Sequence, residues 1–153
     1  MPVSMEQVRA FLDSEEPDYQ QAAHLGPEAL PHLDELVGET DALLASKAAY
    51  MASLIEDPHS ADILRRAAAS DRAEVRAAAA GGASNLSPSV AGDVLEPLLT
   101  DRDVSVRKVA LKSVPEEAPS ELQATVQSLS EADSNPSIRE LSNRVADRLG
   151  RSD

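Results

Sequence analysis

The chain has three histidines that could serve as metal ligands: His24, His32 and His59. His32 lies two residues before Asp34 and His59 lies two residues after Asp57, so each pair could suggest a metal site. Residues two apart point to different sides of a helix, whereas a metal pair on one helix face needs a spacing of four. We therefore expect surface or packed histidines and predict no metal site.

Arrangements for nucleophilic or acid–base catalysis are also missing from the sequence. The chain has no cysteine, which excludes thiolate nucleophiles, disulfides and cysteine-ligated metals. The adjacent carboxylates Glu15 and Glu16, and likewise Glu116 and Glu117, do not face each other as an acid–base pair must. No nucleophile elbow, phosphate-binding glycine loop or dinucleotide-binding glycine motif occurs. We predict a protein that is not an enzyme and has no cofactor.

The net charge of −13 bears on the choice of partner. Binding to a phosphate backbone needs clustered Lys and Arg, so we expect no nucleic-acid partner. Residues 1–41 are the acidic end, because Arg9 is their only cation against Glu6, Asp13, Glu15, Glu16, Asp18, Glu28, Asp34, Glu35, Glu39 and Asp41. An acidic surface is typical of proteins that stay soluble in high salt and of proteins encoded by GC-rich genomes. It also suits docking of a basic partner. The sequence leaves these alternatives open.

Length and hydropathy indicate one water-soluble domain. A chain of 153 residues can bury a sizeable core, and with 42% hydrophobic but only 2% aromatic residues that core must consist of Ala, Leu and Val. No apolar stretch approaches eighteen residues, and the first residues lack the pattern of a secretory signal. We expect a cytoplasmic protein that does not insert into a membrane.

A repeat of 31 to 32 residues organises the chain. The segments SDRAEVRAAAA, TDRDVSVRKVAL and ADSNPSIRELS each contain an Asp, a short polar turn, a β-branched residue and an Arg. The arginines are Arg76, Arg107 and Arg139, and their spacings are 107 − 76 = 31 and 139 − 107 = 32. A similar step backward reaches Lys47, and a further one reaches Gln20, where the pattern is weakest. A fixed period of this length is typical of stacked repeats.

Each unit is predicted to be a pair of antiparallel helices. Apolar residues recur at helical spacing before and after each polar turn, and no strand-like alternation of usable length appears. Pro and Gly at the unit boundaries stop one helix and start the next. The predicted fold is all-α, an α-solenoid of about five helical hairpins in a single domain, with units over 1–25, 26–57, 58–87, 88–116 and 117–151.

The repeated Asp and Arg have a structural explanation. An Asp before a helix can cap its first turn, and an Arg one turn into the helix can hold the carboxylate of an adjacent unit through two hydrogen bonds. The predicted ladder consists of Asp71, Arg76, Asp101, Arg107, Asp133 and Arg139. Stacked arginines could instead form an anion site, for example for a phosphate, and this alternative stays open.

The stretch LGPEALPHLDELVGETDALLASKAAY, and the Asp turn followed by Val-Arg, resemble the short HEAT-like repeats of the phycobilisome-lyase type. That family includes scaffolds, phycobilin-attachment lyases and DNA alkylation repair enzymes. The resemblance implies that the second helices of the hairpins line a concave groove that binds another protein. It also leaves open a lyase or another enzyme that handles a small ligand.

Residues of the second helices outside the core register are the candidates for that groove. They are more basic than the chain as a whole, which predicts an acidic or mixed segment of a partner protein as the ligand, with Met51 and Leu111 as apolar anchors. The candidates are Lys47, Met51, Arg72, Ala77, Lys108, Leu111, Lys112, Glu140, Asn143 and Arg144. The sequence therefore predicts a non-enzymatic scaffold or adaptor.

Overall fold

The computed structural model describes residues 2–150, and this part of the chain is helical without a strand. The predicted all-α class is therefore confirmed. No helix within residues 2–150 is long and apolar enough to cross a bilayer. The elements are α1 (Met5–Leu12), α2 (Tyr19–Ala23), a 3-10 turn η1 (Pro27–Ala29), α3 (Leu30–Val37), α4 (Ala42–Ser53), α5 (Pro58–Ala68), α6 (Ala73–Ala83), α7 (Pro88–Leu99), α8 (Val104–Lys112), α9 (Ser120–Ala132) and α10 (Pro136–Gly150).

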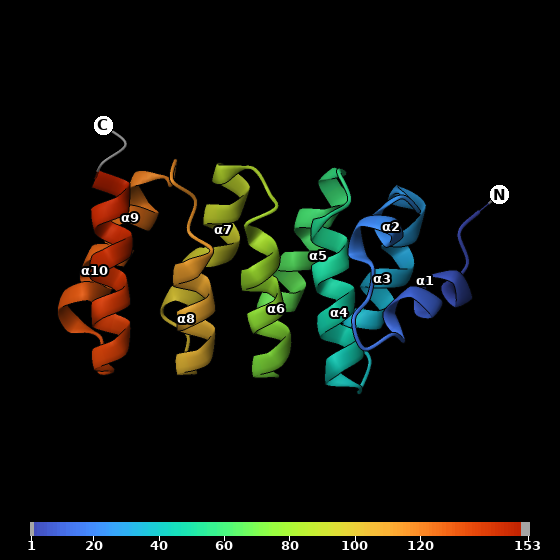
Figure 1. The fold of residues 1–153 in the computed structure, drawn as a ribbon, viewed down its shortest axis with the longest axis horizontal. Helices are drawn as coiled ribbons and strands as arrows, with labels where there is room; N and C mark the ends of the chain where they lie inside the picture. Colours follow the sequence, from blue (N-terminus) through green and yellow to red (C-terminus); the bar gives the residue numbers. More distant parts are fainter. Residues whose placement is uncertain (1, 151–153) are drawn as a thin grey trace.

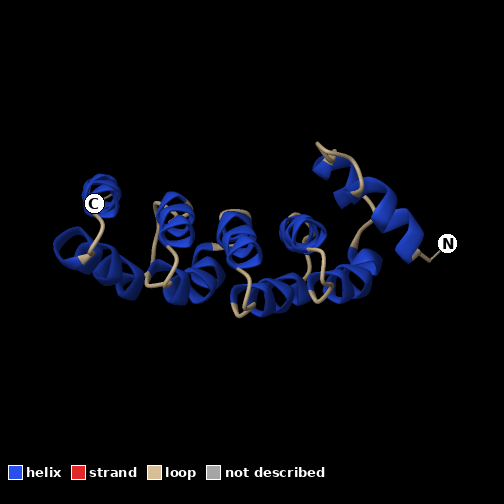
Figure 2. Cartoon of the chain, turned by 90° about the horizontal axis from the view of Figure 1, so that it is seen from below, coloured by secondary structure: helices blue, strands red, loops and turns tan. Residues whose placement is uncertain are grey.

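The helices from α3 onward form two rows that lie one on the other (Figure 1). The first row contains α3, α5, α7 and α9, and the second contains α4, α6, α8 and α10. The rows follow a shallow arc with the second row on its inner side, while α1 and α2 stand at the N-terminal end of that inner side (Figure 2). Below, the first row is called the outer row and the second the inner row.

Local sequence explains where several helices begin. Ser4 and Gln7 form a capping box, in which the Ser4 hydroxyl accepts from the Gln7 backbone and the Gln7 side chain accepts from the Ser4 backbone. Pro58 and Pro88 occupy the first positions of α5 and α7, where a missing N–H costs nothing. Pro27 begins the 3-10 turn η1, which leads directly into α3.

The core consists mainly of Ala, Leu and Val, as the composition predicts, and alanines dominate where the inner helices meet. Ala45, Ala48 and Ala52 of α4 are fully buried, and so is Ala79 of α6. Gly82 shows how closely α4 and α6 approach, because a Cβ built there would lie 2.9 Å from the Cβ of Ser53. Small residues thus place the inner helices close together, which fixes the spacing of the polar groups at their ends.

Candidate functional site

Arg76 on α6 holds Asp101, which belongs to the turn before α8. Its Nε donates to Asp101 Oδ2 at 2.8 Å, its Nη2 to Oδ1 at 3.1 Å, and its Nη1 to the carbonyl of Ser70 at 3.1 Å. The two side chains are only 7% and 8% exposed. The guanidinium therefore connects its own turn to the turn of the next unit.

The pairing changes the titration of both groups. Burial alone raises the pKa of Asp101, but the hydrogen bonds from Arg76 and from the N–H of Asp103 outweigh it, together with the positive charge of Arg76. The pKa of Asp101 is therefore below its ordinary value. The hydrogen bond to Asp101 raises the pKa of Arg76 against the opposing effect of burial. Both groups are charged at neutral pH.

The next unit repeats this pairing with one hydrogen bond fewer, because Arg107 Nε has no hydrogen-bond partner within residues 2–150. Arg107 Nε lies 2.9 Å from Asp133 Oδ2, and Arg107 Nη2 donates to Asp133 Oδ1 at 3.2 Å. Arg107 Nη1 donates to the carbonyl of Asp101 at 2.9 Å, and Arg139 Nη1 donates to the carbonyl of Asp133 at 2.7 Å. Arg76, Asp101, Arg107, Asp133 and Arg139 thus form a continuous ladder along the inner row. The carboxylates already occupy Arg76 and Arg107, which contradicts the alternative of a phosphate site at these two arginines.

One predicted rung is wrong. The side chain of Asp71 is 96% exposed, and its nearest cation is Arg72, 4.0 Å away. Ser70 occupies the ladder position instead: its carbonyl accepts from Arg76, and its hydroxyl accepts from the N–H of Arg72. Asp101 accepts in the same way from the N–H of Asp103.

The capping role also falls on different residues from those predicted. The N-cap of α8 is Asp103, whose carboxylate accepts from the N–H of Ser105. Asn135 plays the same part before α10, where its side chain accepts from the N–H groups of Ser137 and Ile138. Asp101 and Asp133 lie two residues earlier, so they shape the turn and leave the cap to the residue that follows.

Two of the predicted groove residues point away from solvent. Met51 and Leu111 are 0% exposed, so neither can act as an apolar anchor for a partner. Helices of the inner row contact both their neighbours in that row and helices of the outer row. Met51 and Leu111 lie on the covered sides of α4 and α8.

Two predicted cations are used by the fold. Lys47 Nζ donates to the carbonyls of Leu12 and Ser14, at 3.1 and 2.7 Å. Arg72 donates to the carbonyls of Glu39 and Val37, at 2.6 and 3.1 Å. Lys47 thereby holds the segment after α1 against α4, and Arg72 holds the end of α3.

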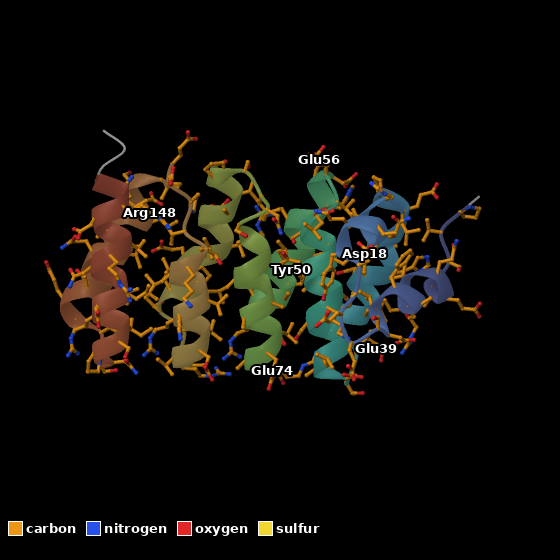
Figure 3. The ribbon with its side chains drawn as sticks, in the orientation of Figure 1. Asp18, Glu39, Tyr50, Glu56, Glu74 and Arg148 are labelled. Carbon is orange, nitrogen blue, oxygen red and sulfur yellow. The ribbon has the colours of Figure 1, made fainter. Side chains whose placement is uncertain are left out.

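Arg148 has a similar structural role at the other end of the chain. Figure 3 labels it near one end of α10, and its Nη2 donates to the carbonyl of Val114 at 2.7 Å. Glu74 and Glu39 are labelled at the opposite edge of the inner row, close to the starts of α6 and α4, and Tyr50 lies on α4 between the two edges. The ring of Tyr50 packs edge-on against Tyr19 at 4.9 Å, as expected for a packed aromatic residue.

Four of the predicted residues do come together, in a groove of about 590 Å³ between α8 and α10. These are Lys108 and Lys112 on α8, and Glu140 and Arg144 on α10. All four are exposed, and within residues 2–150 their side chains make no hydrogen bond or ion pair. Three cations against one carboxylate give the lining a charge of 3 − 1 = +2.

Apolar side chains that the sequence did not single out complete this groove. Val104 is 41% exposed and lies at the start of α8, while Leu141 of α10 is half-buried. Val104 could have been found from its place directly after the Asp turn, ahead of the core position Val106. The α8–α10 groove therefore offers both charge and a small apolar surface.

Two of the three histidines, His32 and His59, contact groups of the fold. A ring nitrogen of His32 lies 2.7 Å from the carbonyl of Val3, which fastens the N-terminal segment to α3. His59 Nδ1 lies 2.7 Å from Asp57 Oδ1 next to the start of α5. Across residues 2–150 no three metal-ligating side chains gather.

Comparison with known proteins adds no family assignment. No protein-family model matches the chain, and no curated protein is similar enough in sequence to count as a relative.

Proposed function

We propose that this protein is a HEAT-like α-solenoid of five helical hairpins that acts as an adaptor, and that it holds an acidic segment of another protein in the α8–α10 groove. The repeat of 31 to 32 residues, the two rows of helices and the ladder that recurs in successive units support the fold assignment. The position of the groove on the inner side of the arc supports the binding role, because stacked repeats commonly bind there.

The observation that carries the proposal is the contrast between cations that the fold uses and cations that it leaves free. Arg76 and Arg107 are paired with buried carboxylates, and Lys47 and Arg72 hold backbone carbonyls. In a chain with a net charge of −13, a surface where three cations accompany a single carboxylate attracts anionic groups that the rest of the surface repels. A carboxylate-rich segment is the ligand that fits it.

The spacing of the cations describes that ligand. Lys108 and Lys112 are one helical turn apart, so their Cα atoms are separated by about 6 Å along the helix axis. Acidic residues at alternate positions of an extended segment have nearly the same separation, roughly 6.6 Å. Arg144 faces them from α10, and Val104 and Leu141 offer contact to an aliphatic side chain. We therefore expect an extended acidic segment with one apolar residue.

The experiment compares three forms of the protein as bait in an extract of the cells that produce it. The groove variant, Lys108→Glu with Lys112→Glu, reverses the charge of two residues in the groove. The control, Arg9→Glu with Arg65→Glu, makes the same change of −4 in net charge at two exposed residues elsewhere. Proteins retained by the wild type and by the control, but lost from the groove variant, are identified by mass spectrometry. Their acidic segments are then synthesised and titrated by calorimetry.

The expected result is at least ~10-fold weaker binding of such a segment to the groove variant, since each of two charge pairs becomes a repulsion. Circular dichroism should show equal melting for the three forms. Equal binding by the groove variant and the control would contradict the proposal.

A further inference from the structure

A second concave surface lies on the outer row, far from the α8–α10 groove. It is a depression of about 670 Å³ formed by η1, α3 and α5, which are neighbours at the N-terminal part of that row (Figure 2). Its volume is within the range of sites that enclose ligands, roughly 300 to 1,000 Å³. Below it is called the α3–α5 depression.

The floor and wall of the α3–α5 depression are apolar. Leu30 of α3 and Ile63 of α5 are buried and form the floor, and Pro27 and Pro31 are exposed and form one wall. Proline has a fixed φ and few side-chain conformations, so this wall loses little entropy when a ligand binds. The surface is therefore already shaped to receive an apolar side chain.

The rim of the depression is acidic. Glu28, Asp34, Asp57 and Asp62 line it, and Arg66 is the only Lys or Arg among its lining residues. With His59 neutral, the lining has a charge of 1 − 4 = −3. Arg66 is already hydrogen-bonded to Asp34, so it does not neutralise the other three carboxylates.

The fold engages the four rim carboxylates to different degrees. The N–H and the ring of His59 donate to Asp57 at 2.9 and 2.7 Å, and these hydrogen bonds lower the pKa of Asp57. Glu28 makes no hydrogen bond or ion pair within residues 2–150, and Asp62 pairs only with the exposed Arg65 at 3.0 Å. Glu28 and Asp62 can thus accept donors from a ligand without the loss of an interaction that holds the fold.

We propose that the α3–α5 depression binds a basic segment of a second partner protein, with one aromatic or aliphatic side chain on Leu30 and Ile63 and with Lys or Arg residues on the acidic rim. The sign of the rim charge excludes acidic segments and nucleic acid as favourable ligands. The apolar floor selects against segments that are basic but carry no anchor. This surface goes beyond the proposed adaptor function, because it differs from the α8–α10 groove in charge, row and position.

The two surfaces together describe a bridging protein. The basic α8–α10 groove lies on the inner row of the last units, and the acidic α3–α5 depression lies on the outer row of earlier ones. Opposite charges prevent one segment from competing for both sites. The chain can therefore hold two different segments at once.

The test uses three synthetic peptides as probes and isotope-labelled protein followed by NMR. The peptide Lys-Lys-Phe-Leu-Lys-Lys should bind and shift the methyl signals of Leu30 and Ile63. The peptides Glu-Glu-Phe-Leu-Glu-Glu and Lys-Lys-Ala-Ala-Lys-Lys should each bind at least ~10-fold more weakly, because the first lacks the charge and the second lacks the anchor. Equal affinity of the alanine peptide would overturn the proposal, since binding would then be unspecific attraction to an acidic protein.

Variants separate this site from the rest of the surface. Glu28→Lys with Asp62→Lys should weaken the Phe-Leu peptide ~10-fold, whereas Glu116→Lys with Glu117→Lys makes the same change of +4 on an exposed loop and should leave the affinity within about 2-fold. Equal losses in the two variants would refute the site. The Lys108→Glu and Lys112→Glu variant should bind this peptide as the wild type does, so the present proposal and the adaptor function fail or stand separately.

Discussion

Arg76 Nε and Nη2 hold both carboxylate oxygens of Asp101, a residue 25 positions later in the chain. This pair joins α6 to the turn that starts α8, and the third nitrogen of the guanidinium is used by the carbonyl of Ser70. A buried ion pair of this kind contributes little when compared with a well-packed apolar pair, but the loss of one partner strands a buried charge. Its consequences are therefore clearest in single substitutions.

Arg76→Ala should destabilise the protein by about 3 to 5 kcal/mol, because Asp101 would stay buried without its cation. The free energy of unfolding from urea titration measures this. Asp71→Ala is the control, because it removes a charged side chain that was predicted to be in the ladder but is exposed. It should change the free energy of unfolding by less than about 0.5 kcal/mol. A large effect of Asp71→Ala would contradict the assignment of Ser70 to the ladder.

Acid should weaken the ladder. Because the folded state lowers the pKa of Asp101 below its ordinary value of 3.8, the contribution of Asp101 to stability is fully present above the unfolded pKa. This contribution is lost as the pH falls through the lower, folded pKa. The difference in unfolding free energy between the wild type and Asp101→Asn should thus be constant near neutral pH and shrink below about pH 4. A difference that is independent of pH down to about pH 2 would argue against the ion pair.

Lys47→Met should loosen the first two helices more than the rest. The substitution removes the donor to the carbonyls of Leu12 and Ser14, which costs about 1 to 2 kcal/mol locally. Hydrogen exchange should become faster in α1 and α2, with little change in α8 and α10. Lys108→Met is the control, since Lys108 has no partner within residues 2–150, and it should leave exchange unchanged throughout.

Two adjacent glycines of α6 should respond in opposite directions to alanine. Gly82→Ala places a Cβ at 2.9 Å from Ser53 Cβ and should destabilise by about 1 to 3 kcal/mol. At Gly81 the nearest atom is Val109 Cγ1 at 3.9 Å, and Gly81→Ala should stabilise the helix by roughly 0.4 to 1 kcal/mol. The melting temperatures of the two variants test this. A change of the same sign in both would disprove the close approach of α4 and α6.

Apolar residues at helical spacing predicted the helical class. The spacing of Arg76, Arg107 and Arg139 predicted most of the ladder, because equivalent residues of a repeat make equivalent contacts. It misplaced one rung, since an Asp directly follows Ser70 and the backbone carbonyl that accepts from Arg76 belongs to Ser70. The sequence around this turn does not show whether Ser70 or Asp71 takes the ladder position. The carbonyl that each Arg reaches is six residues earlier in every unit, and that interval identifies the correct register.

The groove residues were harder to predict for a different reason. Exposure in the inner row depends on neighbours in both rows, so helical periodicity within one segment could not show that Met51 and Leu111 face the interior. Lys47 and Arg72 carry charge, which normally indicates a surface, yet their long side chains reach backbone carbonyls of other units. The cations of the α8–α10 groove are instead exposed, and within residues 2–150 their side chains have no hydrogen-bond partner.

The direction of the ladder sets an order in which the helices can fold during synthesis. Arg76 leaves the ribosome 25 residues before Asp101, and at roughly 5 to 20 residues per second the delay is on the order of one to five seconds. During that time the guanidinium has no carboxylate to bind, so α6 cannot settle into its final burial without an unpaired charge. Arg107 waits in the same way for Asp133, 26 residues later. Each unit is therefore completed only when the next one has emerged, and the nascent chain closes in sequence from its N-terminal side.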